Sequence, residues 1–292
     1  MAEYTWIVAA LPLDETLADV LAAWRRHGMA SGHSERTITS RVYTITRLAR
    51  SVDPMTADRD DLTRWLSELT DGRTGGEAKR SSKATYRAQL RAFYAWLLDT
   101  GRRDDDPSLK LPRPRVSRDH PRPITPAQVE LVLAACADPR SRMIRAYFIL
   151  ACYAGLRVSE IAKFRGEDIR GDELVVSGKG GHSWSLPMHP AITALAATMP
   201  STGWWFPSLG SAGHVHRCSV SSAIKRAMVR AGVPGTPHAA RHHYGTQVLR
   251  ASGGDLRTTQ RAMRHASVAT TAIYTQVADD ALRHAISGIP AA

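Results

Sequence analysis

Prolines are crowded into residues 107–126, near the middle of the chain, and they limit how the whole sequence can fold. Because proline fixes its own φ angle and lacks a backbone N–H, this density excludes a helix and favours an extended segment. Cations lie between the prolines, at Lys110, Arg113, Arg115, Arg118 and Arg122. We therefore expect two domains, over residues 1–110 and 124–292, joined by a basic, proline-rich linker over residues 111–123.

The part of the chain before the prolines has the apolar spacing of helices. Residues 17–24 place an apolar side chain at every third or fourth position, and we expect their helix to end at Gly28. Ser34 can cap a second helix. After a third, Ser81 or Ser82 can open a fourth. The first domain should therefore be helical.

The part after the prolines combines helical periodicity with one pair of short β segments. Residues 173–177 and 183–187 flank a glycine-rich turn, as in a β-hairpin. We expect helices over residues 126–137, 140–154, 189–199, 218–231, 239–252, 255–264 and 268–275. The fold class is therefore mainly α with a small β-sheet.

The positive charge of the chain is concentrated after the linker begins. Residues 111–292 hold 22 Lys and Arg against 11 Asp and Glu, whereas residues 1–110 hold 17 against 16. An excess this one-sided indicates a polyanionic partner, with nucleic acid the first candidate. A proteome that favours arginine is the alternative that charge alone leaves open.

Other features of the sequence argue against a membrane or secreted protein. The longest nearly apolar stretch, residues 147–156, is too short to span a bilayer, and the N-terminus lacks the basic flank of a secretory signal. The cysteines Cys136, Cys152 and Cys218 lie far apart. We interpret them as buried free thiols of a cytoplasmic protein, without a disulfide framework or a cysteine metal site.

Two short motifs each place one cation where an expected element ends or turns, the first at a helix end and the second at a hairpin tip. Arg157 follows Gly155 at the end of an apolar helix, and Glu160 comes three residues later, so a guanidinium could lie at a helix start with a carboxylate to hold it. A simple structural ion pair has the same spacing. Lys179 lies at the tip of the expected hairpin. It is either an ordinary turn residue or a lysine that donates a proton to a leaving oxygen.

Two further motifs carry histidines. His238 and Arg241 are three residues apart, so on a helix they share a face and could address one ligand. A zinc site is the alternative for His238 and His242, but no glutamate follows the first histidine as the metalloprotease pattern requires. In the last motif, His265 precedes a short helix and Tyr274 lies near the end of that helix.

Taken in this order, the four motifs resemble the catalytic domain of the tyrosine recombinases, the family of phage integrases and Xer-type recombinases. The family pattern is an arginine in a GLR-x-x-E segment, a hairpin lysine, H-x-x-R, and a histidine followed nine residues later by a tyrosine. It is matched by Arg157, Lys179, His238, Arg241, His265 and Tyr274. Arg264 departs from the pattern, because the family usually has glycine there. This departure puts the backbone geometry at His265 in doubt, and the side chain could add a phosphate contact.

The resemblance implies a two-domain architecture, a helical core-binding domain followed by a catalytic domain of helices and a β-hairpin. It implies that Tyr274 attacks a phosphate of the DNA backbone and forms a 3′-phosphotyrosyl link. Arg157 and Arg241 would hold the non-bridging oxygens, on which negative charge grows, and His265 would donate a further hydrogen bond.

The resemblance also assigns the protons. A tyrosine has an ordinary pKa of about 10, so it needs a base at neutral pH, and His238 is the candidate. Lys179 would protonate the departing 5′ oxygen, and Glu160 would orient Arg157. This chemistry requires no metal or nucleotide cofactor.

The partners implied are duplex DNA at recombination or attachment sites, further copies of the chain in a tetramer on that DNA, and accessory proteins that set direction, without a membrane. The function expected is that of a site-specific DNA recombinase or integrase. One alternative is a type IB topoisomerase-like enzyme that shares the chemistry but acts as a monomer without site choice. The other is a catalytically silent DNA-binding relative.

Overall fold

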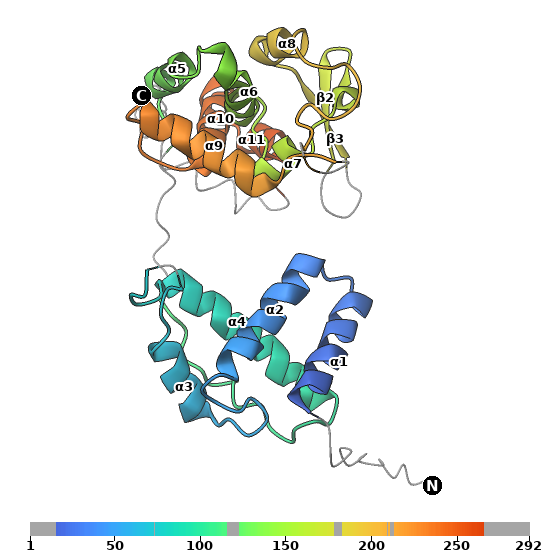
Figure 1. Cartoon of the computed structure of the whole chain (residues 1–292), viewed down its shortest axis with the longest axis vertical. Coiled ribbons are helices and arrows are strands. Elements are labelled where there is room, and N and C mark those ends of the chain that lie inside the picture. Colours follow the sequence, from blue (N-terminus) through green and yellow to red (C-terminus); the bar gives the residue numbers. More distant parts are fainter. Residues whose placement is uncertain are drawn as a thin grey trace, which may run out of the picture. The chain divides into compact units, whose positions relative to one another are not determined.

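The structure is a computed structural model, and it describes residues 16–72, 74–115, 123–177, 183–208, 210 and 213–265. The chain divides into two compact units at residue 118. Figure 1 shows the helices and strands of each unit, and each unit is described by itself below.

The described part of the first unit is helical, as predicted. Its helices are α1 (Leu17–Ala30), α2 (Glu35–Leu48), α3 (Arg59–Ser67) and α4 (Arg80–Asp99). The long α4 contacts both α2 and α3. Large buried side chains from all four helices, among them Trp24, Leu48, Leu62 and Phe93, form one apolar core. Burial of these side chains gives the unit a core of its own.

Two helix boundaries in this unit differ from the prediction. Helix α1 continues through Gly28 to Ala30. A Cβ at Gly28 would lie only 3.1 Å from Cγ1 of Ile38 on α2. The glycine therefore permits close helix packing, and Gly32, with φ 69°, follows as the turn residue. Helix α4 begins at Arg80 without a side-chain cap, so the prediction that Ser81 or Ser82 opens it was wrong.

The first residue of the predicted linker and the residue that follows the linker are each fixed to a unit. Leu111 is buried in the core of the first unit, and its carbonyl oxygen accepts a hydrogen bond from Nε of Arg87 at 3.0 Å. Ile124 is buried in the core of the second unit, and Nδ1 of His243 lies 2.7 Å from its carbonyl oxygen. The apolar residue Leu111, predicted to lie in the linker, thus packs with the residues before it.

The described part of the second unit surrounds one buried helix. Its helices are α5 (Pro126–Ala134), α6 (Arg142–Tyr153), α7 (Val158–Ala162), α8 (Pro190–Ala196), α9 (Arg217–Arg230), α10 (Pro237–Ala251) and α11 (Leu256–Met263), with 3-10 turns at Pro139–Ser141 and Gly166–Asp168. Every residue of α6 from Ala146 to Cys152 is buried, and α6 contacts α8, α9 and α10 (Figure 1). A stretch of helix that is apolar on all sides has to be covered on all sides, as residues 146–152 are.

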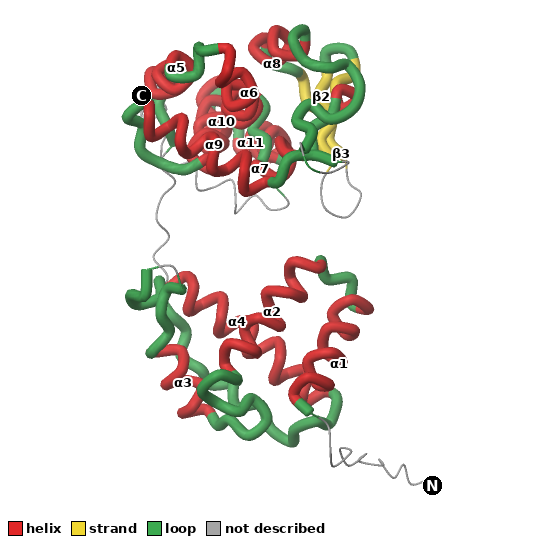
Figure 2. The backbone as a smooth tube through the Cα atoms, in the orientation of Figure 1, coloured by secondary structure: helices red, strands yellow, loops and turns green. Residues whose placement is uncertain are grey.

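A small antiparallel sheet lies at one side of the second unit, shown in yellow in Figure 2. Its strands are β1 (Ile169–Arg170), β2 (Glu173–Ser177) and β3 (Ser183–Pro187), in the order β1-β2-β3. Val175 pairs with Ser185, and the bounds of β2 and β3 agree with the predicted hairpin. Strand β1 was not predicted, because two residues are too few to show a period. The fold class, mainly α with a small sheet, is confirmed.

The three cysteines divide by burial. Cys136 and Cys152 are buried free thiols, as predicted, but Cys218 is exposed. Cys218 lies in the first turn of α9, whose opposite face packs Val220 and Ile224 into the core, so the prediction of burial was wrong for this residue. In the described part of the chain, no helix has both the length and the apolar character needed to cross a membrane.

Candidate active site

The turn that follows α6 is fixed against α10 by a glycine. Gly155 has a φ of +58°, a conformation that glycine adopts without steric cost. A Cβ at this position would lie 2.3 Å from Cδ1 of Tyr244 on α10. The backbone of the turn therefore rests directly on the tyrosine ring, which sets where the next residues begin.

Arg157 is the N-cap residue of α7 and is held by Glu160. The Glu160 carboxylate accepts the backbone N–H of Arg157 at 2.8 Å and its Nη1 at 2.8 Å. The same glutamate thus caps the helix and orients the guanidinium, as the three-residue spacing predicts. The Arg157 side chain remains 41% exposed, so one side of the guanidinium faces solvent.

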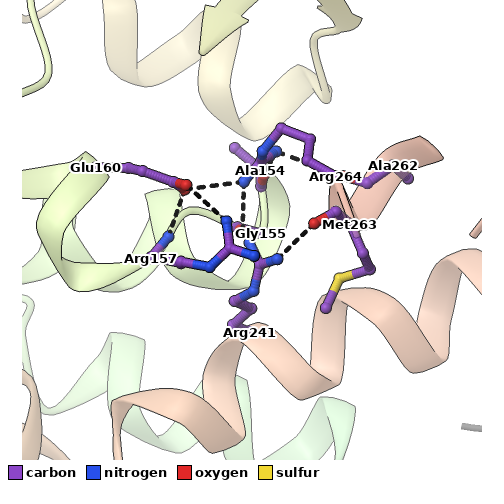
Figure 3. Close-up of polar contacts among 8 residues, drawn as sticks. All are labelled: Ala154, Gly155, Arg157, Glu160, Arg241, Ala262, Met263 and Arg264. Carbon is purple, nitrogen blue, oxygen red and sulfur yellow. Dashed lines mark hydrogen bonds and ion pairs between the residues drawn. The ribbon is translucent and has the colours of Figure 1, made fainter. Parts of the chain in front are cut away.

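Arg241, on α10, joins three segments of the second unit. It is buried, and its Nη1 donates to the carbonyl oxygen of Gly155 while Nη2 donates to that of Met263 at 2.5 Å. Figure 3 shows its guanidinium between the turn after α6 and the end of α11. A guanidinium has five N–H donors, so it can bind backbone oxygens and a phosphate together.

Arg264 adopts the backbone conformation that glycine usually supplies at a helix end. It follows α11 with φ 52° and ψ 47°, in the left-handed region. Its side chain is only 1% exposed, and Nη2 donates to Glu160 at 3.0 Å and to the carbonyl of Gly155 at 2.9 Å (Figure 3). The idea that this side chain adds a phosphate contact was wrong, because the guanidinium points into the protein.

Arg157 and Arg264 keep the carboxyl group of Glu160 ionised. Burial alone would raise the pKa of the Glu160 carboxyl, but the charge of Arg264 and the hydrogen bonds from Arg157 bring it below its ordinary value. In Arg264, burial lowers the pKa of the guanidinium, and the attraction of Glu160 opposes that effect. The carboxylate is therefore ionised at neutral pH and shared between two guanidiniums.

His265 follows Arg264 and lies close to the same cations. Its backbone N–H donates to the carbonyl oxygen of Gln260 at 3.1 Å. Burial, and then the charges of Arg241 and Arg157, lower the pKa of the His265 ring to about 4. The ring is therefore neutral at neutral pH and can donate one hydrogen bond to an anion.

His238 lies in the first turn of α10, three residues before Arg241, so the two share a helix face. It is exposed, and its ring centroid lies 6.3 Å from that of His242. Burial, and then the charges of His238 and Arg241, lower the pKa of His242 to about 4. Within the described ranges, no three histidine, cysteine or acidic side chains gather as metal ligands would.

A hollow of about 870 Å³ lies beside the exposed part of Arg157. Lys163 and Arg165 also line it, and the guanidinium of Arg165 lies 4.7 Å from the centre of the Trp204 ring. Neither cation was singled out from the sequence, although both belong to the charge excess noted after residue 111. A second hollow of about 810 Å³, between β3 and α11, is lined by His265 and other residues.

Arg241 is bonded to the carbonyls of Gly155 and Met263, two residues before Arg157 and His265, so the structure brings these three predicted site residues into one region. His238 lies on the same helix as Arg241. The other two predicted site residues, Lys179 and Tyr274, lie outside the described residues.

Comparisons with known proteins identify the family of the chain. The model of the phage integrase family matches residues 122–281. Tyrosine recombinase XerD of Caulobacter vibrioides is 33% identical over 226 residues, which cover 70% of this chain and 74% of that protein. Tyrosine recombinase XerC of Erythrobacter litoralis is 33% identical over 241 residues, which cover 77% of this chain and 76% of that protein.

Solved structures share the fold. A lambda integrase dimer bound to a COC′ core site has a TM-score of 0.71 at 17% identity, covering 87% of this chain and 96% of that one. A lambda integrase tetramer bound to a Holliday junction has a TM-score of 0.72 at 16% identity, covering 90% and 78%. The recombinase relatives favour that activity over the topoisomerase-like and catalytically silent alternatives. The chain therefore belongs to the phage integrase family, and it is a tyrosine-type site-specific DNA recombinase.

Proposed function

We propose that this recombinase cuts DNA with Tyr274 as nucleophile while Arg157, Arg241 and His265 hold the scissile phosphate. The observation that carries the proposal is the anchoring of Arg241 on the carbonyl of Gly155, two residues before Arg157. That bond ties the positions of the two arginines to one turn of backbone. Hydrogen-bond donors that are held in place before the reaction stabilise the developing negative charge without having to reorganise. This stabilisation is usually the largest single contribution to the rate enhancement.

In the proposed reaction, the phenolic oxygen of Tyr274 bonds to phosphorus and the bond from phosphorus to the 5′ oxygen breaks. His238 takes the phenolic proton, and Lys179 gives a proton to the departing oxygen. A 3′-phosphotyrosyl link and a free 5′ hydroxyl result. Attack by a 5′ hydroxyl of another strand reverses the steps and rejoins DNA. The roles of Lys179 and Tyr274 rest on their match to the family motif.

We further propose that the substrate is duplex DNA carrying attachment or recombination sites, and that four copies assemble on it, with accessory proteins setting direction. The excess of 22 cations over 11 anions in residues 111–292 supports a DNA backbone as partner. Lambda integrase, which shares the fold, forms a tetramer on a Holliday junction. That precedent supports the same number of copies here.

The test uses a labelled duplex site with a nick next to the scissile phosphate, so that the covalent intermediate accumulates. We expect the wild-type protein to become attached to the 3′ end, and Tyr274→Phe to bind the site equally well without attachment. A second site added to the reaction should exchange strands with the first. Attachment by Tyr274→Phe would rule out Tyr274 as nucleophile, and attachment of the wild type without strand exchange between the two sites would favour a topoisomerase.

A further inference from the structure

Arg264 combines several unfavourable features in one residue. Among the described residues it is the only non-glycine residue with positive φ, and a left-handed backbone is unfavourable for an L-residue. Its guanidinium is 1% exposed, and its Nε is buried without a hydrogen-bond partner in the described residues. Such features usually occur where the surroundings or the function require them.

The contacts of Arg264 lie behind both arginines that we assign to the phosphate. Its Nη2 shares the carboxylate of Glu160 with Arg157, and it shares the carbonyl oxygen of Gly155 with Arg241. Figure 3 shows these residues as one group, in which Arg264 approaches Glu160 and Gly155 from the side of α11. Arg264 is thus bonded to the anchor of each phosphate-binding arginine and exposes almost no surface of its own.

The charges show what this arrangement achieves. Glu160 and Arg157 alone form a pair without net charge, so the carboxylate that orients Arg157 also weakens the attraction of Arg157 for a phosphate. Arg264 adds a second positive charge to this pair, with its Nη2 3.0 Å from Oε2 of Glu160. The side chains of Arg157, Glu160 and Arg264 together then carry a net charge of +1. In a partly buried site this charge is felt more strongly than it would be in water.

We propose that Arg264 is a positioning residue that offsets the charge of Glu160 from inside the protein, so that Arg157 acts on the scissile phosphate as a full cation. This inference rests on the proposed role of Arg157 in holding the phosphate. Glu160 and Arg264 then act together on Arg157. The carboxylate sets the direction of Arg157, and the buried guanidinium removes the electrostatic penalty of having a carboxylate there.

The first variant to measure is Arg264→Gly, because glycine adopts the left-handed backbone without strain. Since the guanidinium of Arg264 is only 1% exposed and itself contacts no phosphate, DNA affinity should fall much less than the rate of attachment, and its dependence on salt should not change. The first-order rate of covalent attachment at saturating enzyme should fall about tenfold, the lower end of what loss of an outer hydrogen-bond partner costs activity at metal sites. Arg140→Gln, an exposed arginine in the turn before α6, is the control for loss of one charge.

The decisive comparison is the double variant Glu160→Gln with Arg264→Gly. Glutamine can still accept the backbone N–H at the start of α7, but it carries no charge to offset. If Arg264 acts by offsetting that charge, the double variant should attach to DNA several times faster than Arg264→Gly alone. A double variant as slow as Arg264→Gly, or slower, would overturn the inference and leave Arg264 with a purely structural role.

Two controls keep this result separate from other failures. Far-UV circular dichroism checks folding, and if the glycine variant is unfolded, Arg264→Asn replaces it in both backgrounds, because asparagine also tolerates the left-handed backbone. Wild-type protein and Tyr274→Phe are run in the same assay. Attachment by the wild type with an unchanged rate for Arg264→Gly would refute this inference alone, whereas attachment by Tyr274→Phe would refute the proposed nucleophile.

Discussion

Replacing Gly155 by alanine should destabilise the second unit through two separable effects. The φ of +58° makes any side chain unfavourable, which costs about 1 kcal/mol. The new Cβ would also lie 2.3 Å from a ring carbon of Tyr244, well inside contact distance. Tyr244 packs beside the buried residues Leu249 and Met263, so moving its ring adds a cost of about 1–3 kcal/mol. We expect a total loss of about 2–4 kcal/mol in the free energy of unfolding.

Gly171 offers a matched control in the same unit. Its φ is +65°, nearly that of Gly155, but nothing lies within 4 Å of the position of its Cβ. Gly171→Ala should therefore lose only the backbone contribution of about 1 kcal/mol. The difference between the two variants measures the overlap with Tyr244 alone.

The cysteines give an assay that reports only on the second unit, because all three lie there. Cys136 and Cys152 are buried and Cys218 is exposed, so a thiol reagent labels Cys218 at once and the other two only on unfolding. The urea dependence of labelling at Cys152, read by mass spectrometry, gives the free energy of unfolding. Equal losses for Gly155→Ala and Gly171→Ala would refute the reasoning, since they would show that the tyrosine ring does not restrict the turn.

Three further predictions concern the site. The pKa of His265 is lowered from 6.5 to about 4 in the folded protein, so between these values the unfolded chain binds a proton that the folded protein does not. The labelling assay should therefore show the free energy of unfolding falling as the pH drops from 6.5 towards 4. His265→Gln should reduce the slope of that fall. Lys179→Ala should slow cleavage, and a 5′-bridging phosphorothioate, a better leaving group, should restore the rate; a rate that stays low would exclude Lys179 as the acid. Chelation by EDTA should leave cleavage intact, and loss of cleavage would instead indicate a metal-dependent nuclease.

The motif spacing predicted those parts of the site that depend on residues close together in sequence. Glu160 follows Arg157 by three residues, and the first turn of a helix brings these positions together, so the ion pair could be expected. The hairpin over 173–177 and 183–187 was predictable for the same reason, since its two strands are neighbours along the chain. Local periodicity and capping thus account for most of the elements.

Contacts between distant segments could not be predicted in this way. The sequence around Gly28 is typical of a helix end. The role of this glycine, however, is to let Ile38 of another helix pack closely against it, and only the folded structure shows that contact. Arg264 reads as an exposed cation near a DNA site, yet its partners, Gly155 and Glu160, lie more than a hundred residues earlier. A buried arginine can be identified only when its counter-ion is seen beside it.

The most direct test of the account is a structure of Tyr274→Phe bound to its duplex site. We predict that nitrogen atoms of Arg157 and Arg241 lie within about 3 Å of the non-bridging oxygens of one phosphate, with His265 beside the same phosphate. Residue 274 should lie on the side of the phosphorus opposite the 5′ oxygen, in line for displacement of that oxygen. Guanidinium groups that bind two different phosphates, or none, would contradict the account.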